Sequence, residues 1–160
     1  MRLRQPRIWL LLGLVLFITS GCTFWQKRAE KPMFEFSSGG AYHFEGYGEW
    51  QIKVDAAGNF SVAHNVQGEV KPYGTFTLTE KETADLWQLI RASHIEEMSP
   101  PQRAGVPDEV QYTFNLEDET DVYTVKVWIN DARQNDQIVA LVNQIAMLIK
   151  KYTGETPILN

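Results

Sequence analysis

The sequence is poor in the residues that most often bind metals or form disulfides. Its 160 residues include one cysteine, Cys22, and three histidines, His43, His64 and His94. A single cysteine excludes an intramolecular disulfide, and no histidine lies in an H-E-x-x-H pattern or beside a cysteine pair, as zinc motifs require. A metal site of His43, Glu45 and His64 is an open alternative, although exposed strand and loop histidines explain the same residues. We therefore expect no metal and no cofactor.

No hydrophobic run is as long as a transmembrane helix, which needs ~20 predominantly apolar residues. The longest run, Ile8 to Ile18, is shorter than that, and Arg2, Arg4 and Arg7 precede it. A basic start, a short apolar stretch and then the small residues Ser20-Gly21 are the features of a signal peptide. The sequence therefore predicts an exported protein.

The segment Ile18-Thr19-Ser20-Gly21-Cys22 resembles a bacterial lipobox, where a signal peptide is cut and the new N-terminal cysteine is acylated. The resemblance implies that residues 1–21 are a lipoprotein signal peptide and that a lipid on Cys22 holds the chain to the membrane. Acylation would also remove a thiol that is reactive in an oxidising compartment. Thr23 stands where an aspartate would retain the protein in the inner membrane. This implies a cell-envelope location, at the outer membrane facing the periplasm if the cell has two membranes.

Two alternatives to a lipoprotein stay open for the N-terminus. One is an ordinary secretory peptide, and the other is an N-terminal membrane anchor with an incidental cysteine.

Basic residues are the minority, with 15 Lys and Arg against 20 Asp and Glu and a formal net charge of −5. Removing residues 1–21 takes away three basic residues and no acidic ones, which shifts the net charge to −8. Nucleic acids and anionic bilayer surfaces attract clusters of Lys and Arg. We therefore expect no nucleic-acid partner.

The short motifs of nucleophilic catalysis are also missing. There is no G-x-S-x-G elbow, and Ser38-Gly39-Gly40 lacks the lysine and the spacing of a phosphate-binding loop. The acidic residues Asp108-Glu109 and Glu117 to Glu119 lie at an expected strand entry and turn tip, where solvated carboxylates are common. General acid–base catalysis also requires a pocket. We expect a non-enzymatic protein, and a deep pocket around His43 or His64 would indicate the contrary.

Hydrophobic periodicity predicts one domain over residues 33–160, preceded by a polar, lipidated tether over residues 22–32. Alternating apolar residues and turn residues at 55–59 and 67–68 predict a meander of antiparallel strands. The strands expected in order are 33–36, 50–54, 60–64, 73–78, 110–116 and 123–129, with a hairpin tip at 117–121.

Two helices are expected between and after these strands. Thr79 and Glu82 form a capping box for a helix that ends near Ser93. A second helix begins at Asp131 or Asn135 and ends at Gly154, because apolar residues recur every three or four positions up to that glycine. The order of elements predicts an α+β fold, an antiparallel sheet (meander plus hairpin) with two helices packed on one face.

Two segments are candidates for binding a partner. Prolines restrict the loop from Ser99 to Asp108, which lowers the entropy cost of presenting Arg103, Val106 and Asp108. The alternative is that this loop only connects a helix to a strand.

The other candidate is the glycine-rich and aromatic segment from Gly39 to Trp50. Its side chains Tyr42, Phe44 and Tyr47 can stack on a sugar or a peptide. The alternative is that they cover the edge of the sheet.

The order of these features resembles the emfourin family of protein inhibitors of thermolysin-type metalloproteases. The resemblance lies in Gly39-Gly40 after the first strand, TLTEKETADLWQLI from Thr77, a proline-containing loop and DEVQYTFNLEDE from Asp108. A Thr/Val-rich strand and a terminal Leu-rich helix complete it. It implies a shared fold and, as an alternative to a simple binding or accessory domain with an envelope protein partner, inhibition of an envelope protease.

Overall fold

One antiparallel sheet organises the molecule. In the computed structural model, which describes residues 31–40 and 47–159, six strands pair in the order β4-β3-β2-β1-β5-β6. They are β1 (Met33–Ser38), β2 (Glu49–Asp55), β3 (Asn59–Val66), β4 (Glu69–Thr77), β5 (Gln111–Glu117) and β6 (Val122–Trp128). The first strand, β1, lies between β2 and β5. It therefore joins the meander β2–β4 to the hairpin β5–β6.

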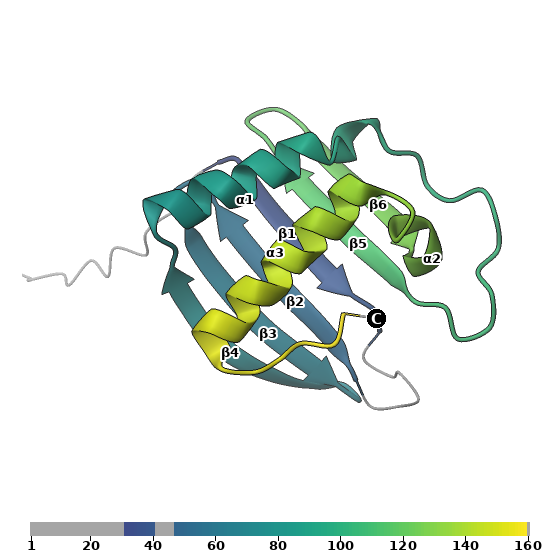
Figure 1. Ribbon diagram of the computed structural model, residues 1–160, viewed down its shortest axis with the longest axis horizontal. Coiled ribbons are helices and arrows are strands. Elements are labelled where there is room, and N and C mark those ends of the chain that lie inside the picture. The colour runs from purple at the N-terminus through teal and green to yellow at the C-terminus, as the bar shows by residue number, and fades with distance from the viewer. Residues whose placement is uncertain (1–30, 41–46, 160) are drawn as a thin grey trace, which may run out of the picture.

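The helices lie on one side of this sheet. They are α1 (Glu80–Ala92), the short α2 (Ile129–Ala132) and α3 (Asp136–Thr153), with a 3-10 turn η1 (Ile95–Glu97) after α1. Figure 1 shows α1 and α3 running across the same face of the sheet. The predicted α+β fold is confirmed. In the described part of the chain, no helix is long and apolar enough to cross a membrane.

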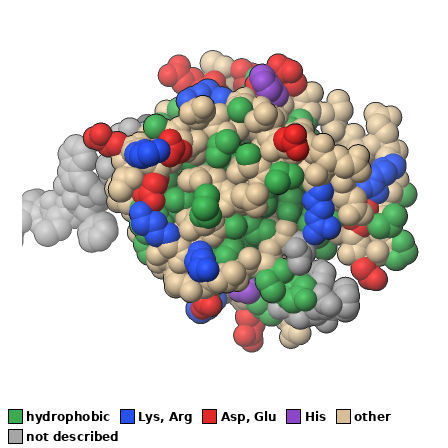
Figure 2. All heavy atoms as spheres, viewed as in Figure 1, with side chains coloured by type: hydrophobic (Ala, Val, Ile, Leu, Met, Phe, Trp, Pro, Cys, Tyr) green, Lys and Arg blue, Asp and Glu red, His purple; other side chains and the backbone are tan. Residues whose placement is uncertain are grey.

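The core fills the space between the sheet and the two long helices. Alternate strand residues point into it, as the period of two predicts. Fully buried side chains from the strands and helices are Phe34, Phe36, Phe60, Phe114, Leu86, Ile90, Leu141, Ile145 and Ile149. Figure 2 shows this side of the molecule, where charged side chains surround patches of apolar ones.

The helix ends follow the sequence signals. Thr79 and Glu82 form the predicted capping box, with the Glu82 amide donating to Thr79 Oγ1 at 3.3 Å and the Thr79 amide to Glu82 Oε2 at 3.0 Å. Asn135, one of the two predicted starts, caps α3, and Gly154 ends it with φ 79°. The predicted start and end of both long helices are therefore confirmed.

Glu82 has a second role that the capping box does not predict. Its carboxylate accepts hydrogen bonds from Lys151 Nζ at 2.6 Å and from the Tyr152 hydroxyl at 2.9 Å, which ties α1 to the end of α3. The hydrogen bond from Lys151, with smaller contributions from Thr79 and Tyr152, lowers the pKa of Glu82 to about 2. The carboxylate is thus ionised at neutral pH.

Three details differ from the sequence prediction. The strand β4 begins at Glu69 rather than at Tyr73, because it pairs with β3 along its whole length despite a register shift at Val62/Ala63. Pro72 is tolerated there because β4 is an edge strand. The elements η1 and α2 were not predicted, since three or four residues are too few to show a helical period.

Candidate binding surfaces

The loop between η1 and β5 is held by a branched ion pair centred on Arg103. The guanidinium donates to Glu109 through Nη1 at 2.8 Å and Nη2 at 2.7 Å, and to Asp131 through Nε and Nη2 at 3.0 to 3.1 Å. The indole Nε1 of Trp128 donates to the Arg103 carbonyl at 3.2 Å. A Cβ at Gly105 would lie 2.5 Å from the Trp128 ring, so only glycine allows this approach. We call these contacts the Arg103 brace.

Glu109 is the buried member of the Arg103 brace. Its side chain is 1% exposed, against 37% for Arg103. It also accepts hydrogen bonds from the amides of Val106 at 3.0 Å and Asn130 at 3.2 Å. Arg103 first, and then these amides, lower the pKa of Glu109 to about 2, although burial opposes the shift. The interpretation of Glu109 as a solvated carboxylate is therefore wrong, because the loop folds back and places Arg103 over it.

Residues 106 to 109 form a tight turn within the same loop. The Glu109 amide donates to the Val106 carbonyl at 3.1 Å, Pro107 occupies the second position, and Asp108 has φ 64°. Proline followed by a residue of positive φ is the pattern of a type II turn. The turn leaves the Val106 side chain 53% exposed. The predicted residues Arg103, Val106 and Asp108 thus lie together, but Arg103 is bound by carboxylates of its own chain, and Val106 is the exposed apolar contact.

The structure describes only part of the aromatic segment from Gly39 to Trp50. Tyr42 and Phe44 lie outside the described residues. The carbonyl of Tyr47 accepts a hydrogen bond from His64 Nε2 at 2.7 Å, and the His64 ring stacks on Trp50 with centroids 4.2 Å apart. Tyr73 stacks on the same indole at 5.7 Å. His64, which the sequence suggested as a metal ligand, is thus used to join Tyr47 to an aromatic stack.

The sheet face turned away from α1 and α3 carries polar side chains. A shallow hollow of about 540 Å³ crosses its middle. Lys53 pairs with Glu35 at 2.8 Å, the hydroxyls of Ser61 and Thr75 share a hydrogen bond of 2.7 Å, and Asn115 donates to Glu35 at 3.5 Å. These side chains form hydrogen bonds with one another between neighbouring strands. Among the described residues, this face shows paired polar side chains and gives no indication of a ligand.

The structure also brings together a group that the sequence did not predict. His94, Glu96 and Glu97 place one possible ligand atom each within 4.8 Å of one another, and all three are exposed. The pattern arises because His94 has φ 50° and turns the chain into η1. Exposed acidic groups without a buried ligand do not indicate a metal site, so this group carries no functional assignment.

Cys22 and residues 1–21 lie outside the described residues, so lipidation stays a prediction. Two carboxylates of the described residues whose pKa is lowered to about 2, Glu82 and Glu109, form ion pairs that hold the fold. Such use is structural rather than acid–base chemistry.

A scan of the sequence against models of protein families finds no matching family, and a search of curated proteins finds no matching relative.

Proposed function

We propose that the chain is a lipid-anchored protein of the cell envelope whose domain binds a partner protein and catalyses no reaction. The sequence from Ile18 to Cys22, which ends in the only cysteine, carries this proposal. The strand β1 begins at Met33, eleven residues after Cys22. Eleven extended residues span at most about 40 Å. A lipid on Cys22 would therefore keep the domain near the bilayer, which favours a partner that is itself close to the membrane.

The test compares the wild-type chain with Cys22→Ser and with Ser20→Ala, which keeps a small residue before the cleavage site. Intact mass is measured on protein extracted from membranes. We expect the wild-type and Ser20→Ala chains to lack residues 1–21 and to carry an added mass of acyl chains. Cys22→Ser should remain an uncleaved precursor without that mass. A Cys22→Ser chain that matures with the same lipid, or a wild-type chain without lipid, would refute the anchor.

A second candidate function is inhibition of an envelope metalloprotease, as the resemblance to the emfourin family implies. The Arg103 brace favours it, because it fixes the loop conformation while Val106 stays exposed. A loop that is already ordered loses little conformational entropy on binding. The same property would serve any protein partner, so the two candidates differ in whether the partner's activity stops.

Titration of thermolysin with the chain from Thr23 to Asn160 separates the candidates. An inhibitor lowers the rate of peptide hydrolysis to a stoichiometric endpoint, whereas a binding protein leaves the rate unchanged. Val106→Asp should abolish the inhibition. Val122→Asp is the matched control, since Val122 is an exposed valine (70%) on β6, outside the loop. An unchanged rate at excess chain would remove the inhibitor candidate and leave the anchor test unaffected.

A further inference from the structure

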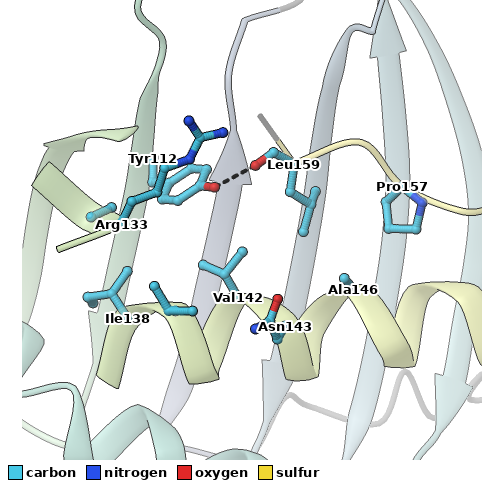
Figure 3. A pocket seen from close by; sticks show the side chains of 10 residues that line it. Tyr112, Arg133, Ile138, Val142, Asn143, Ala146, Pro157 and Leu159 are labelled. Carbon is cyan, nitrogen blue, oxygen red and sulfur yellow. Dashed lines mark hydrogen bonds between the residues drawn. The ribbon is translucent and has the colours of Figure 1, made fainter. Parts of the chain in front are cut away.

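A second part of the molecule, away from the braced loop, has the form of a small-molecule site. A cavity of about 320 Å³ lies between α3, β5 and the segment 154–159 that follows α3. Figure 3 shows Tyr112 reaching from β5 toward Leu159 on one side, with Val142, Asn143 and Ala146 on the helix below. The apolar lining comes from Ile138, Val139, Val142, Ala146, Pro157 and Leu159. Ligand pockets begin at about this volume.

Polar groups of Tyr112, Arg133 and Asn143 face this cavity beside the apolar ones. The Tyr112 hydroxyl donates to the Leu159 carbonyl. Arg133 lies beside Tyr112, and Asn143 offers an amide from the next turns of α3. Burial raises the pKa of Tyr112, while the charge of Arg133 opposes the shift. The hydroxyl therefore stays protonated, and the nearest formal charge is the positive one of Arg133.

The guanidinium of Arg133 differs from that of Arg103 in its partners. Arg103 holds two carboxylates. Among residues 31–40 and 47–159, no acidic side chain forms an ion pair with Arg133. An arginine without a carboxylate partner at the edge of a cavity can bind an anion through charge-assisted hydrogen bonds.

The segment 154–159 is the wall of the cavity that can adjust. Gly154 reverses the chain with φ 79°, and Glu155 is bound by Lys71 and Tyr73 at 3.3 Å each. Beyond Glu155, the Leu159 carbonyl accepts the hydrogen bond from Tyr112. The Glu155 amide also donates to Thr153 Oγ1 at 3.1 Å, and Leu159 packs against the core. None of these contacts belongs to the strand pairing of the sheet, so an outward movement of the wall would leave the sheet intact.

We propose that this cavity binds a small alkyl carboxylate, with the chain against Val142, Ala146 and Leu159 and the carboxylate on Arg133. The apolar lining selects the alkyl chain, and the cation without an acidic partner selects a negative head group. The positive charge of Arg133 would repel an ammonium head group, and a neutral head group would form no hydrogen bond between two charged partners. The proposal concerns a surface separate from the Val106 loop and does not depend on the function of that loop.

Octanoate is the probe, and 1-octanol is its uncharged counterpart. Binding is followed by amide chemical shifts of the chain from Thr23 to Asn160, which keeps every described strand and helix. Octanoate should shift the amides of Tyr112, Val139, Ala146 and Leu159. Arg133→Gln should weaken octanoate about tenfold or more while changing octanol little, since a hydrogen bond to a charged group is lost. Ala146→Leu should fill the cavity and weaken both.

Lys150→Gln is the matched control, because it removes one positive charge from the exposed part of α3 without touching the cavity. It should bind octanoate as the wild-type chain does. Three results would each overturn the proposal: no amide shifts with octanoate below its micelle concentration, shifts that map to other residues, or equal binding by Arg133→Gln and the wild-type chain.

Discussion

Two irregular segments of this molecule are held in opposite ways. The loop that contains Arg103 to Glu109 is held by two hydrogen bonds from the Arg103 guanidinium to the buried Glu109 carboxylate. The Trp128 indole adds a hydrogen bond to the Arg103 carbonyl. The segment 154–159 after α3 depends on Glu155 at its start and on one hydrogen bond from Tyr112 at its end. Apart from the Gly154 amide, which donates to the Lys150 carbonyl at the end of α3 at 3.0 Å, neither segment is held by helix or strand hydrogen bonds. The difference is in the number and charge of the hydrogen bonds that hold each segment.

This difference assigns the two segments different kinds of recognition. A braced loop presents Val106 in one conformation, which suits binding to a protein surface without a large entropy cost. A weakly held segment beside a cavity can shift to admit a small ligand. The segment 154–159 is called the tail from here on. The variants below test whether the loop and the tail respond independently, as their separate contacts imply.

The largest effect is expected from Glu109→Ala. It leaves Arg103 without its main partner and removes the acceptor of the Val106 and Asn130 amides. The free energy of unfolding should fall, and amide exchange in the loop should accelerate while exchange at 155–159 stays unchanged. Urea unfolding and residue-resolved exchange measure both. Glu119→Ala, which removes an exposed carboxylate at the β5–β6 hairpin, should leave both quantities near the wild-type values; equal effects of the two variants would refute the brace.

Acid should weaken the brace as Glu109 becomes protonated. The folded pKa of Glu109 is about 2, below its ordinary value of 4.5, so the unfolded chain binds more protons between these values. The stabilisation by Glu109 is present above pH 4.5 and is lost as pH falls toward 2. The difference in unfolding free energy between the wild-type chain and Glu109→Gln should therefore shrink over this range. Urea midpoints from pH 5 to pH 2.5 measure it, and a constant difference would contradict the assignment.

A smaller effect is expected from the turn that follows Val106. Asp108 has φ 64°, a conformation that a β-branched residue adopts poorly. Asp108→Val should lower the free energy of unfolding by about 1–2 kcal/mol, while Asp108→Gly should keep it or raise it slightly. Thermal unfolding of the pair distinguishes backbone strain from loss of the carboxylate. If both variants lost the same stability, the carboxylate rather than the turn would be responsible.

The smallest effect is expected from Tyr112→Phe, which removes only the hydrogen bond to Leu159. A neutral hydrogen bond contributes about 0.5–1.5 kcal/mol, and the loss should be confined to the tail. Proteolysis after residue 154 should accelerate, whereas cleavage in the loop should not. Loop cleavage that accelerates equally would show that the two segments are coupled.

The sequence predicts the parts of this fold that repeat locally. Alternation around Trp50 and Ile52, the capping box at Thr79 and the glycine at 154 each act within a few residues, so periodicity and turn chemistry reveal them. The order of strands in the sheet was not predicted, because β1 pairs with β5 across 70 or more residues.

The contacts of the Val106 loop and of the Arg133 cavity were also hard to predict, because they join residues that are far apart in the sequence. Val106 was identified as an exposed loop residue, since proline and glycine surround it in the sequence. The Arg103 brace was not, because it joins residues 103, 109 and 131, whose spacing matches no local motif. Glu109 looked like a solvated carboxylate, and its burial results from the contacts of the loop with Trp128 and Asp131. Arg133 carried no sequence signal, because its cavity forms only when the segment after Gly154 folds back.

Amide hydrogen exchange on the chain from Thr23 to Asn160 tests the central comparison most directly. The Val106 and Glu109 amides donate within the braced loop, at 3.0 and 3.1 Å. The account predicts that these two exchange much more slowly than the amides of Ile158 and Leu159. Equal, rapid exchange in both segments would contradict it, because the loop would then present no fixed surface to a partner.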